Sequence, residues 1–163
     1  MSTPLTIDII DDDPTMCEMV KDMLLKKFPG SKVTMYHTGE EALADVGMAP
    51  DMVILDYQLD TVKADAMNGI QVLAKLKEGY PDLPVIFLSS QDRMEVAANT
   101  IKYGAHDYIV KNETAFHKLE IAVNNIAKIK KLKNSHGFQK TMSTVVWALL
   151  LILIAYVIYL RFT

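Results

Sequence analysis

The chain has 163 residues, of which 50% are apolar and 23% are charged, enough for one ordinary domain with a single core. This composition excludes a collagen-like, a disordered and a disulfide-stapled chain. The single cysteine, Cys17, has no partner for an internal disulfide, so we expect a reducing compartment, the cytoplasm.

The net charge of −3 combines two parts of opposite sign. Residues 1–127 contain all 20 acidic side chains and 11 basic ones, whereas residues 128–163 contain six basic side chains and no acidic one. Residues 142–160 are apolar at 17 of 19 positions and carry no charge. The sequence thus predicts an acidic globule, poorly suited to binding nucleic acid, and a tail that meets a different environment.

Five short apolar runs alternate with helical patterns along the acidic part. The first run ends in three acids followed by Pro14, which suits the first turn of a helix. Thr38 and Glu41 have the spacing of a capping box. The predicted strands are residues 5–10, 32–37, 52–55, 85–88 and 108–110, and the predicted helices are residues 14–28, 38–46, 69–78, 93–103 and 114–133.

This alternation predicts the α/β fold class. Mostly apolar strands separated by helices favour a parallel sheet that is covered on both faces. Right-handed crossovers then leave the doubly wound, three-layer fold as the main candidate. We expect one folded domain over residues 1–133, a linker over 134–141 and a transmembrane helix over 142–160.

Polar side chains follow four of the predicted strands, at the edge where a doubly wound sheet binds its ligands. They are Asp11, Asp12 and Asp13 after the first strand, Asp56 after the third, Ser89 and Ser90 after the fourth, and Lys111 after the fifth. Clustered carboxylates require a hard cation or a lysine, and oxygen ligands suit Mg²⁺. A carboxylate beside such a cation can attack phosphorus, while a hydroxyl and an ammonium hold the transferred oxygens. The pattern predicts phosphoryl transfer onto an aspartate.

Each of these residues also has a simpler structural interpretation. An aspartate in the first acidic run, Asp13 above all, can cap the first helix. Considered alone, Asp56 is typical of a turn residue and Lys111 is typical of a solvated lysine. Tyr108 suits a half-buried aromatic of the sheet as well as a functional residue. The coincidence of four such sites on successive strand ends favours the functional interpretation.

Four stretches carry a resemblance to a known family. IIDDDPT (9–15), VILDYQ (53–58), VIFLSS (85–90) and GAHDYIVK (104–111) occur in the order of the receiver domain of two-component response regulators. The chain is similar to the single-domain chemotaxis regulator over roughly residues 5–130. The resemblance implies a flavodoxin-like sheet in the order 2-1-3-4-5.

The resemblance also implies a role for each site residue. It implies that Asp56 is the phosphoacceptor and receives its phosphoryl group from a histidine kinase or phosphotransfer protein. Mg²⁺ is then bound by Asp11, Asp12, Asp56 and the backbone carbonyl of Gln58. The remaining roles are phosphoryl binding for Ser89 and Lys111, an aromatic switch for Tyr108, and tuning of dephosphorylation for Gln58 and Gln91.

The chain departs from the family pattern at three places. The loop between Asp56 and Gly69 is longer by several residues, and Ser90 replaces a small apolar residue. Asn112 follows Lys111 where the family commonly has a proline with a cis peptide. A cis bond before a non-proline residue costs about 2.5–4 kcal/mol, so we expect a trans peptide there.

The apolar tail has the length of a membrane span. Nineteen residues at a rise of 1.5 Å give about 28 Å, close to the hydrocarbon core of a bilayer. Interfacial aromatics stand near its ends at Trp147, Tyr156 and Tyr159. Five lysines precede the span and only Arg161 follows it, so the positive-inside rule places the folded domain in the cytoplasm at the inner membrane. A buried or oligomerising helix is the alternative.

We therefore expect a membrane-anchored single-domain response regulator, which is not an enzyme and acts by protein contact or phosphoryl relay on an output protein. One alternative is a Mg²⁺-dependent phosphohydrolase with an aspartate nucleophile. Such enzymes usually need a second aspartate two residues later, where this chain has Gln58. The other alternative is a pseudo-receiver that serves as a membrane scaffold without being phosphorylated.

Overall fold

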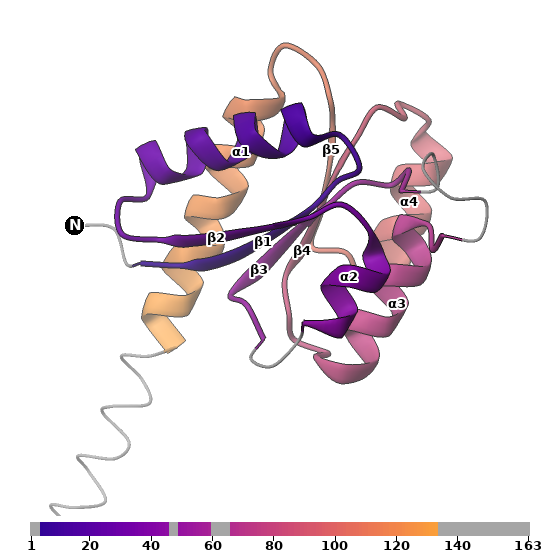
Figure 1. Cartoon of the computed structure of the whole chain (residues 1–163), viewed down its shortest axis with the longest axis horizontal. Helices are drawn as coiled ribbons and strands as arrows, with labels where there is room; N and C mark the ends of the chain where they lie inside the picture. The colour runs from indigo at the N-terminus through magenta and orange to yellow at the C-terminus, as the bar shows by residue number, and fades with distance from the viewer. Residues whose placement is uncertain (1–3, 46–48, 60–65, 134–163) are drawn as a thin grey trace, which may run out of the picture. The chain divides into compact units, whose positions relative to one another are not determined.

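The computed structural model describes residues 4–45, 49–59 and 66–133, in which five strands form one parallel sheet (Figure 1). The strands are β1 Thr6–Ile10, β2 Lys32–Tyr36, β3 Met52–Leu55, β4 Val85–Ser89 and β5 Asp107–Val110. The helices are α1 Pro14–Lys27, α2 Gly39–Ala44, α3 Gly69–Gly79 and α4 Met94–Lys102. Residues 115–133 are also helical. The strand order, β2-β1-β3-β4-β5, confirms the α/β class and the flavodoxin-like topology.

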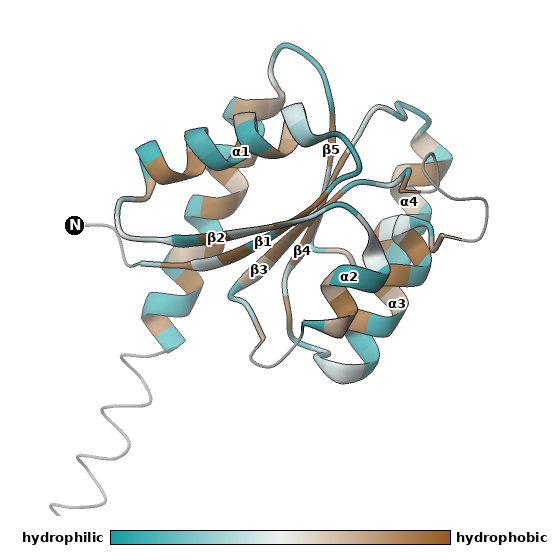
Figure 2. Cartoon of the chain, viewed as in Figure 1, coloured by the Kyte–Doolittle hydropathy of each residue, from teal (hydrophilic) through white to brown (hydrophobic). Residues whose placement is uncertain are grey.

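Two apolar clusters cover the two faces of the sheet. Alternation along β1 sends Ile7 and Ile9 into one cluster and Ile10 into the other. The first cluster packs against α1 and the helix that starts at residue 115, and the second packs against α2 and α3 (Figure 1). Figure 2 shows apolar strands at the centre with polar residues on the outer surfaces of the helices. Burial on both faces is what the nearly continuous apolar strands predicted.

Local capping sets the start of each helix that positions the site. The Asp13 side chain accepts a hydrogen bond from Thr15 N at 2.9 Å and caps α1, so the capping role considered for this acid is confirmed. Thr38 caps α2 through Glu41 N, one half of the predicted capping box, whereas the Glu41 side chain accepts from His37 N and not from Thr38 N. At α3 the side chain of Asn68 and that of Gln71 cap each other's backbone amides, a capping box that the sequence analysis missed.

Several predicted boundaries shift by one or two residues. β2 ends at Tyr36, and the imidazole of the next residue, His37, contacts Asp11 O. Arg93 is the N-cap of α4 and not its first residue. No cis peptide bond occurs among the described residues, so the predicted trans peptide between Lys111 and Asn112 is confirmed.

The chain divides into a unit of residues 1–127 and a second unit of residues 128–163. Of the second unit the structure describes residues 128–133, which are helical. The predicted linker over 134–141 and the predicted transmembrane helix over 142–160 lie outside the described residues. Among the helices of the described part, none combines the length and the apolar character that a bilayer crossing requires.

Candidate phosphoryl-transfer site

Three carboxylates meet at the carboxyl edge of the sheet. Asp11 follows β1 and Asp56 follows β3, and because these strands are parallel neighbours, their ends adjoin. Both side chains are buried and Asp12 is half-buried. One carboxylate oxygen from each of the three lies within 4.8 Å of the others. The structure thus brings together the three acids that the sequence analysis assigned to one site.

Lys111 joins two of these carboxylates from the end of β5. Its Nζ lies 2.8 Å from Asp11 Oδ2 and 3.2 Å from Asp56 Oδ2. Its backbone N donates to Ser89 O at 2.7 Å, which holds the residue beside the end of β4. Burial alone would lower the pKa of Lys111, but hydrogen bonds and charges from Asp11 and Asp56 outweigh it and raise the pKa. The lysine is therefore a permanent cation at the site.

The pKa values of the other two carboxyl groups, those of Asp56 and Asp12, are raised. Burial, with the charge of Asp11 in addition, raises the pKa of Asp56, although Lys111 and the Tyr57 amide counteract part of that shift. Burial and the neighbouring Asp11 charge also raise the pKa of Asp12. Both shifts mean that the site favours an added positive charge near these two carboxylates.

Every polar atom of Asp11 is held by a described neighbour. Its backbone N donates to Tyr36 O at 3.1 Å, and its Oδ1 accepts from Asp13 N at 3.0 Å. Its carbonyl accepts from two side chains, His37 Nδ1 at 3.3 Å and Cys17 Sγ at 3.4 Å. Neither His37 nor Cys17 was assigned a role at the site from the sequence. The acid loop is therefore fixed from both β2 and α1.

The backbone around Asp56 is equally constrained. Asp56 N donates to Ile10 O at 2.8 Å, and Tyr57 N donates to Asp56 Oδ1 at 2.7 Å. Gly69, the first residue of α3, donates its N–H to Tyr57 O at 3.0 Å. A Cβ at Gly69 would collide with the Asp56 carbonyl oxygen and lie 2.9 Å from Tyr57 Cα. The longer loop therefore returns to a position that only a glycine can occupy.

Ser89 and Tyr108 lie on the neighbouring strands. Ser89 is fully buried and its Oγ accepts from Gln91 N at 3.2 Å, whereas Ser90 is exposed. Tyr108 donates its hydroxyl proton to Gln91 O at 2.8 Å, and its ring stacks on Phe87 with centroids 6.1 Å apart. Burial raises the pKa of the Tyr108 hydroxyl, and a hydrogen bond with Ser89 offsets part of that shift. Ser89, Gln91 and Tyr108 thus form one hydrogen-bonded group.

The donor set suits Mg²⁺. Asp11, Asp12 and Asp56 supply three carboxylates against the single ammonium of Lys111, which leaves an excess of negative charge for a divalent cation to neutralise. Gln58, half-buried and two residues after Asp56, offers a backbone carbonyl in the same loop. When bound, a hard cation at such a site screens the charge between a carboxylate nucleophile and an incoming phosphoryl group.

Comparison with known proteins places this arrangement in a family. Residues 7–124 match the model of the response regulator receiver domain. The probable transcriptional regulatory protein TcrX of Mycobacterium tuberculosis is 34% identical over 109 residues, 66% of this chain and 44% of TcrX. The regulatory protein LuxO of Vibrio cholerae is 34% identical over 104 residues, 63% of this chain and 22% of LuxO. The receiver domain of the Francisella response regulator 1452 aligns with a TM-score of 0.67 and 26% identity, covering 77% of this chain and 98% of that domain.

The fold and the acid site are those of two-component signalling proteins that are phosphorylated on an aspartate. This chain belongs to the response regulator receiver domain family. Receiver domains interact with histidine kinases and output proteins, and they generally bind Mg²⁺ at an acidic pocket such as the one described here. The chain spans 44% of TcrX and 22% of LuxO.

Proposed function

We propose that the chain is a membrane-anchored response regulator that accepts a phosphoryl group on Asp56 from a histidine kinase or phosphotransfer protein. The observation that carries the proposal is the position of Lys111 Nζ, within 3.2 Å of both the Asp11 and the Asp56 carboxylates. A buried acid cluster with a fixed ammonium is the arrangement that a carboxylate needs to approach an anionic phosphoryl group.

In the proposed reaction, a carboxylate oxygen of Asp56 forms the new bond to phosphorus. The bond between phosphorus and the donor histidine nitrogen breaks, and its electron pair stays on the imidazole. Asp11, Asp12, Asp56 and the Gln58 carbonyl would hold Mg²⁺, which would screen the negative charge of the incoming phosphoryl group. Lys111, already 3.2 Å from Asp56 Oδ2, turns its ammonium to the transferred oxygens, and the Ser89 hydroxyl donates a hydrogen bond to one of them.

Tyr108 is the proposed switch residue, and its contacts explain how it could respond. Its hydroxyl donates to Gln91 O, and Gln91 N donates to Ser89 Oγ. A phosphoryl oxygen that accepts a hydrogen bond from Ser89 disturbs the hydrogen bonds among Ser89, Gln91 and Tyr108, which allows the tyrosine ring to change rotamer. Output then passes to another protein by contact or by phosphoryl relay.

The test of this function is uptake of phosphoryl from a small acyl-phosphate donor by the full-length chain in detergent, measured by intact mass. We expect a single added phosphoryl group that depends on Mg²⁺. No uptake would leave the pseudo-receiver scaffold as the better interpretation. Continuous release of phosphate without an accumulated phosphoprotein would indicate the phosphohydrolase.

Two amides are expected to set the lifetime of the phosphoprotein. Replacing both Gln58 and Gln91 by alanine should change the rate of phosphoryl loss without blocking uptake, because neutral amides can orient water without acting as bases. Alanine at 91 keeps both backbone hydrogen bonds of that residue. Decay of the added mass after removal of the donor measures the lifetime, and an unchanged lifetime would contradict the role of both amides.

The proposed anchor is the apolar segment 142–160. The full chain should sediment with membranes and resist extraction by alkaline carbonate, because a spanning helix is held by burial and not by charge. A chain cut after Asn134 should stay in the supernatant and still take up phosphoryl. Extraction of the full chain by carbonate or high salt would indicate that the tail is a peripheral or oligomerising helix and not a membrane span.

The charge pattern orients the proposed anchor. Lysines precede the apolar segment and Arg161 alone follows it, so the receiver is proposed to face the cytoplasm. The seven residues 135–141 reach at most about 25 Å when extended, which keeps the receiver near anionic lipid. Protease should therefore cut the receiver from the cytoplasmic side, and cleavage from outside intact cells would contradict this orientation.

A further inference from the structure

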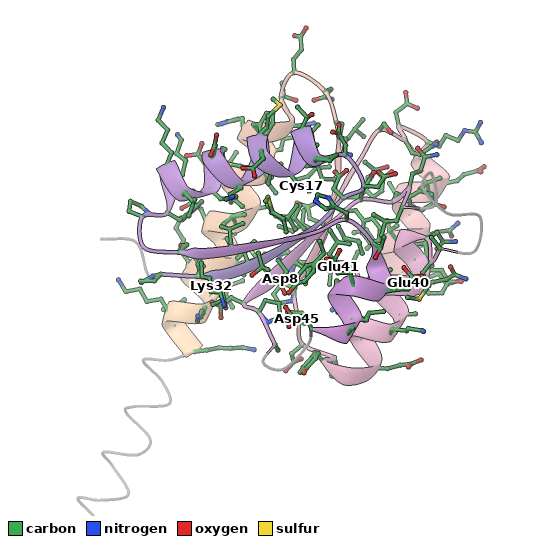
Figure 3. The ribbon with its side chains drawn as sticks, in the orientation of Figure 1. Asp8, Cys17, Lys32, Glu40, Glu41 and Asp45 are labelled. Atoms are coloured by element: carbon green, nitrogen blue, oxygen red, sulfur yellow. The ribbon has the colours of Figure 1, made fainter. Side chains whose placement is uncertain are left out.

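Two loops of the site, one carrying Asp11 and one returning to Asp56, are both hydrogen-bonded to the segment that begins α2. His37 Nδ1 lies 3.3 Å from Asp11 O, and Glu40 Oε1 accepts from Met67 N at 2.8 Å. Glu40 and Glu41 belong to the first turn of α2, and Cys17 is a buried residue of α1 (Figure 3). His37, just before α2, and Glu40, in its first turn, therefore contact the backbones of both loops.

The His37 contact defines where the imidazole proton lies. A carbonyl oxygen only accepts, so Nδ1 must be the donor to Asp11 O. Nδ1 carries a proton both in one neutral tautomer and in the imidazolium, so the contact does not depend on the charge of the ring. The backbone N of His37 donates to Glu41 Oε2 at 3.1 Å, which ties the residue to α2.

The Glu40 contact reaches Asp56 through the start of α3. Met67 lies two residues before Gly69, whose N–H donates to Tyr57 O and whose Cα faces the Asp56 carbonyl without room for a side chain. A matching close approach docks α2 itself, because a Cβ at Gly39 would collide with the Val72 side chain of α3. Glu40 thus holds Met67, near the end of the long loop, two residues before Gly69 contacts the Asp56 carbonyl.

We propose that His37 and Glu40 are positioning residues of the phosphoryl site, which hold the Asp11 loop and the loop after Asp56 at a fixed separation through α2. The inference rests on the proposed function of that site. Each acts through the backbone of another residue, His37 through Asp11 O and Glu40 through Met67 N. The reason for such positioning is electrostatic. Three carboxylates within 4.8 Å repel one another, so they would move apart if their loops were free to move.

The His37 part is tested with asparagine and glutamine. The amide nitrogen of asparagine occupies the place of Nδ1, whereas that of glutamine occupies the place of Nε2. In His37→Ala and His37→Gln we expect the full-length chain in detergent to bind Mg²⁺ about fivefold more weakly, the change that corresponds to one neutral hydrogen bond. His37→Asn should restore the wild-type affinity. The readout is calorimetric titration with Mg²⁺ alone, with the melting temperature recorded for each variant.

The Glu40 part is tested by hydrogen exchange at the Met67 amide. Glu40→Ala removes the acceptor, so that amide should exchange several-fold faster and the rate of phosphoryl uptake should fall, whereas Glu40→Gln keeps an acceptor oxygen and should preserve both. Glu18→Ala is the matched control, because Glu18 is an exposed glutamate of α1 that pairs with Lys21. It should change neither quantity.

The outcomes separate this inference from the proposed function. Equal Mg²⁺ affinity in the His37→Ala, His37→Asn and wild-type chains, or equal Met67 exchange in Glu40→Ala and wild type, would overturn the inference while phosphoryl uptake by the wild type still stood. A loss of affinity that asparagine and glutamine restore equally would also overturn it, because a specific Nδ1 donor is required. Failure of the wild type to take up phosphoryl would overturn the proposed function, and Mg²⁺ affinities would still decide the inference.

Discussion

Asp56→Asn is expected to leave the chain folded and to abolish the phosphoryl gain in intact mass. The amide is a poor nucleophile, and among the described residues Asp56 is the carboxylate at the end of β3 that faces the acid pair. The fold should persist because Lys111 keeps Asp11 at 2.8 Å and the asparagine oxygen can still accept from Tyr57 N. Removing one of three crowded carboxylates should hold the melting temperature or raise it by a few degrees.

The matched control for this variant is Asp13→Asn. Asp13 adjoins the site in sequence but caps α1, and asparagine caps a helix as well as aspartate does. This variant should take up phosphoryl at the wild-type rate. If Asp56→Asn gained the same mass as the wild type, with Asp13→Asn unaffected, another residue would be the acceptor and the assignment of Asp56 would be wrong.

Gly69→Ala is expected to have the largest effect on stability. The added methyl would meet the carbonyl oxygen of Asp56 and the Cα of Tyr57, which are backbone atoms that cannot rotate away. Overpacking of this kind costs about 2–3 kcal/mol, which corresponds to a melting temperature lower by roughly 5–10 °C. The same displacement should slow phosphoryl uptake, because the acceptor residue itself must move. Thermal unfolding and uptake are measured on the same sample.

Gly79→Ala supplies the comparison within the same helix. A Cβ at Gly79 meets nothing within 4 Å, and alanine has the better helix propensity, so stability should be unchanged or higher by up to about 1 kcal/mol. Uptake should match the wild type. Equal losses of stability in both variants would show that the contact of residue 69 with Asp56 is not the cause of the loss.

The parts of the site that the sequence predicted share a simple geometric cause. In a parallel sheet, residues that follow neighbouring strands lie at one edge, so Asp11, Asp56, Ser89 and Lys111 could be grouped once the strands were recognised. The central strands β3 and β4 were readable because they are almost wholly apolar and buried at every position. The α1 and α2 caps were also readable, since they depend on residues close in sequence.

The parts that were missed depend on tertiary contacts. His37 was predicted as the last residue of the second strand, whereas β2 ends at Tyr36 and its pairing with β1 brings His37 to Asp11. The hydrogen bond between Met67 N and Glu40 Oε1 joins residues that are 27 apart in sequence, so no local sequence pattern predicts it. The requirement for glycine at 69 arises from the backbone of Asp56, which adjoins it only after folding.

The buried position of Cys17 has a practical consequence for labelling the protein. Burial, together with the negative charges of Asp11 and Asp13, raises the pKa of its thiol to about 11, so at neutral pH only about one molecule in ten thousand carries the reactive thiolate. The thiol is also fully enclosed between α1 and the sheet, with its Sγ against Asp11 O. A reporter cysteine introduced on an exposed helix surface would therefore react with maleimide dyes selectively in the folded chain, and the native cysteine could be retained.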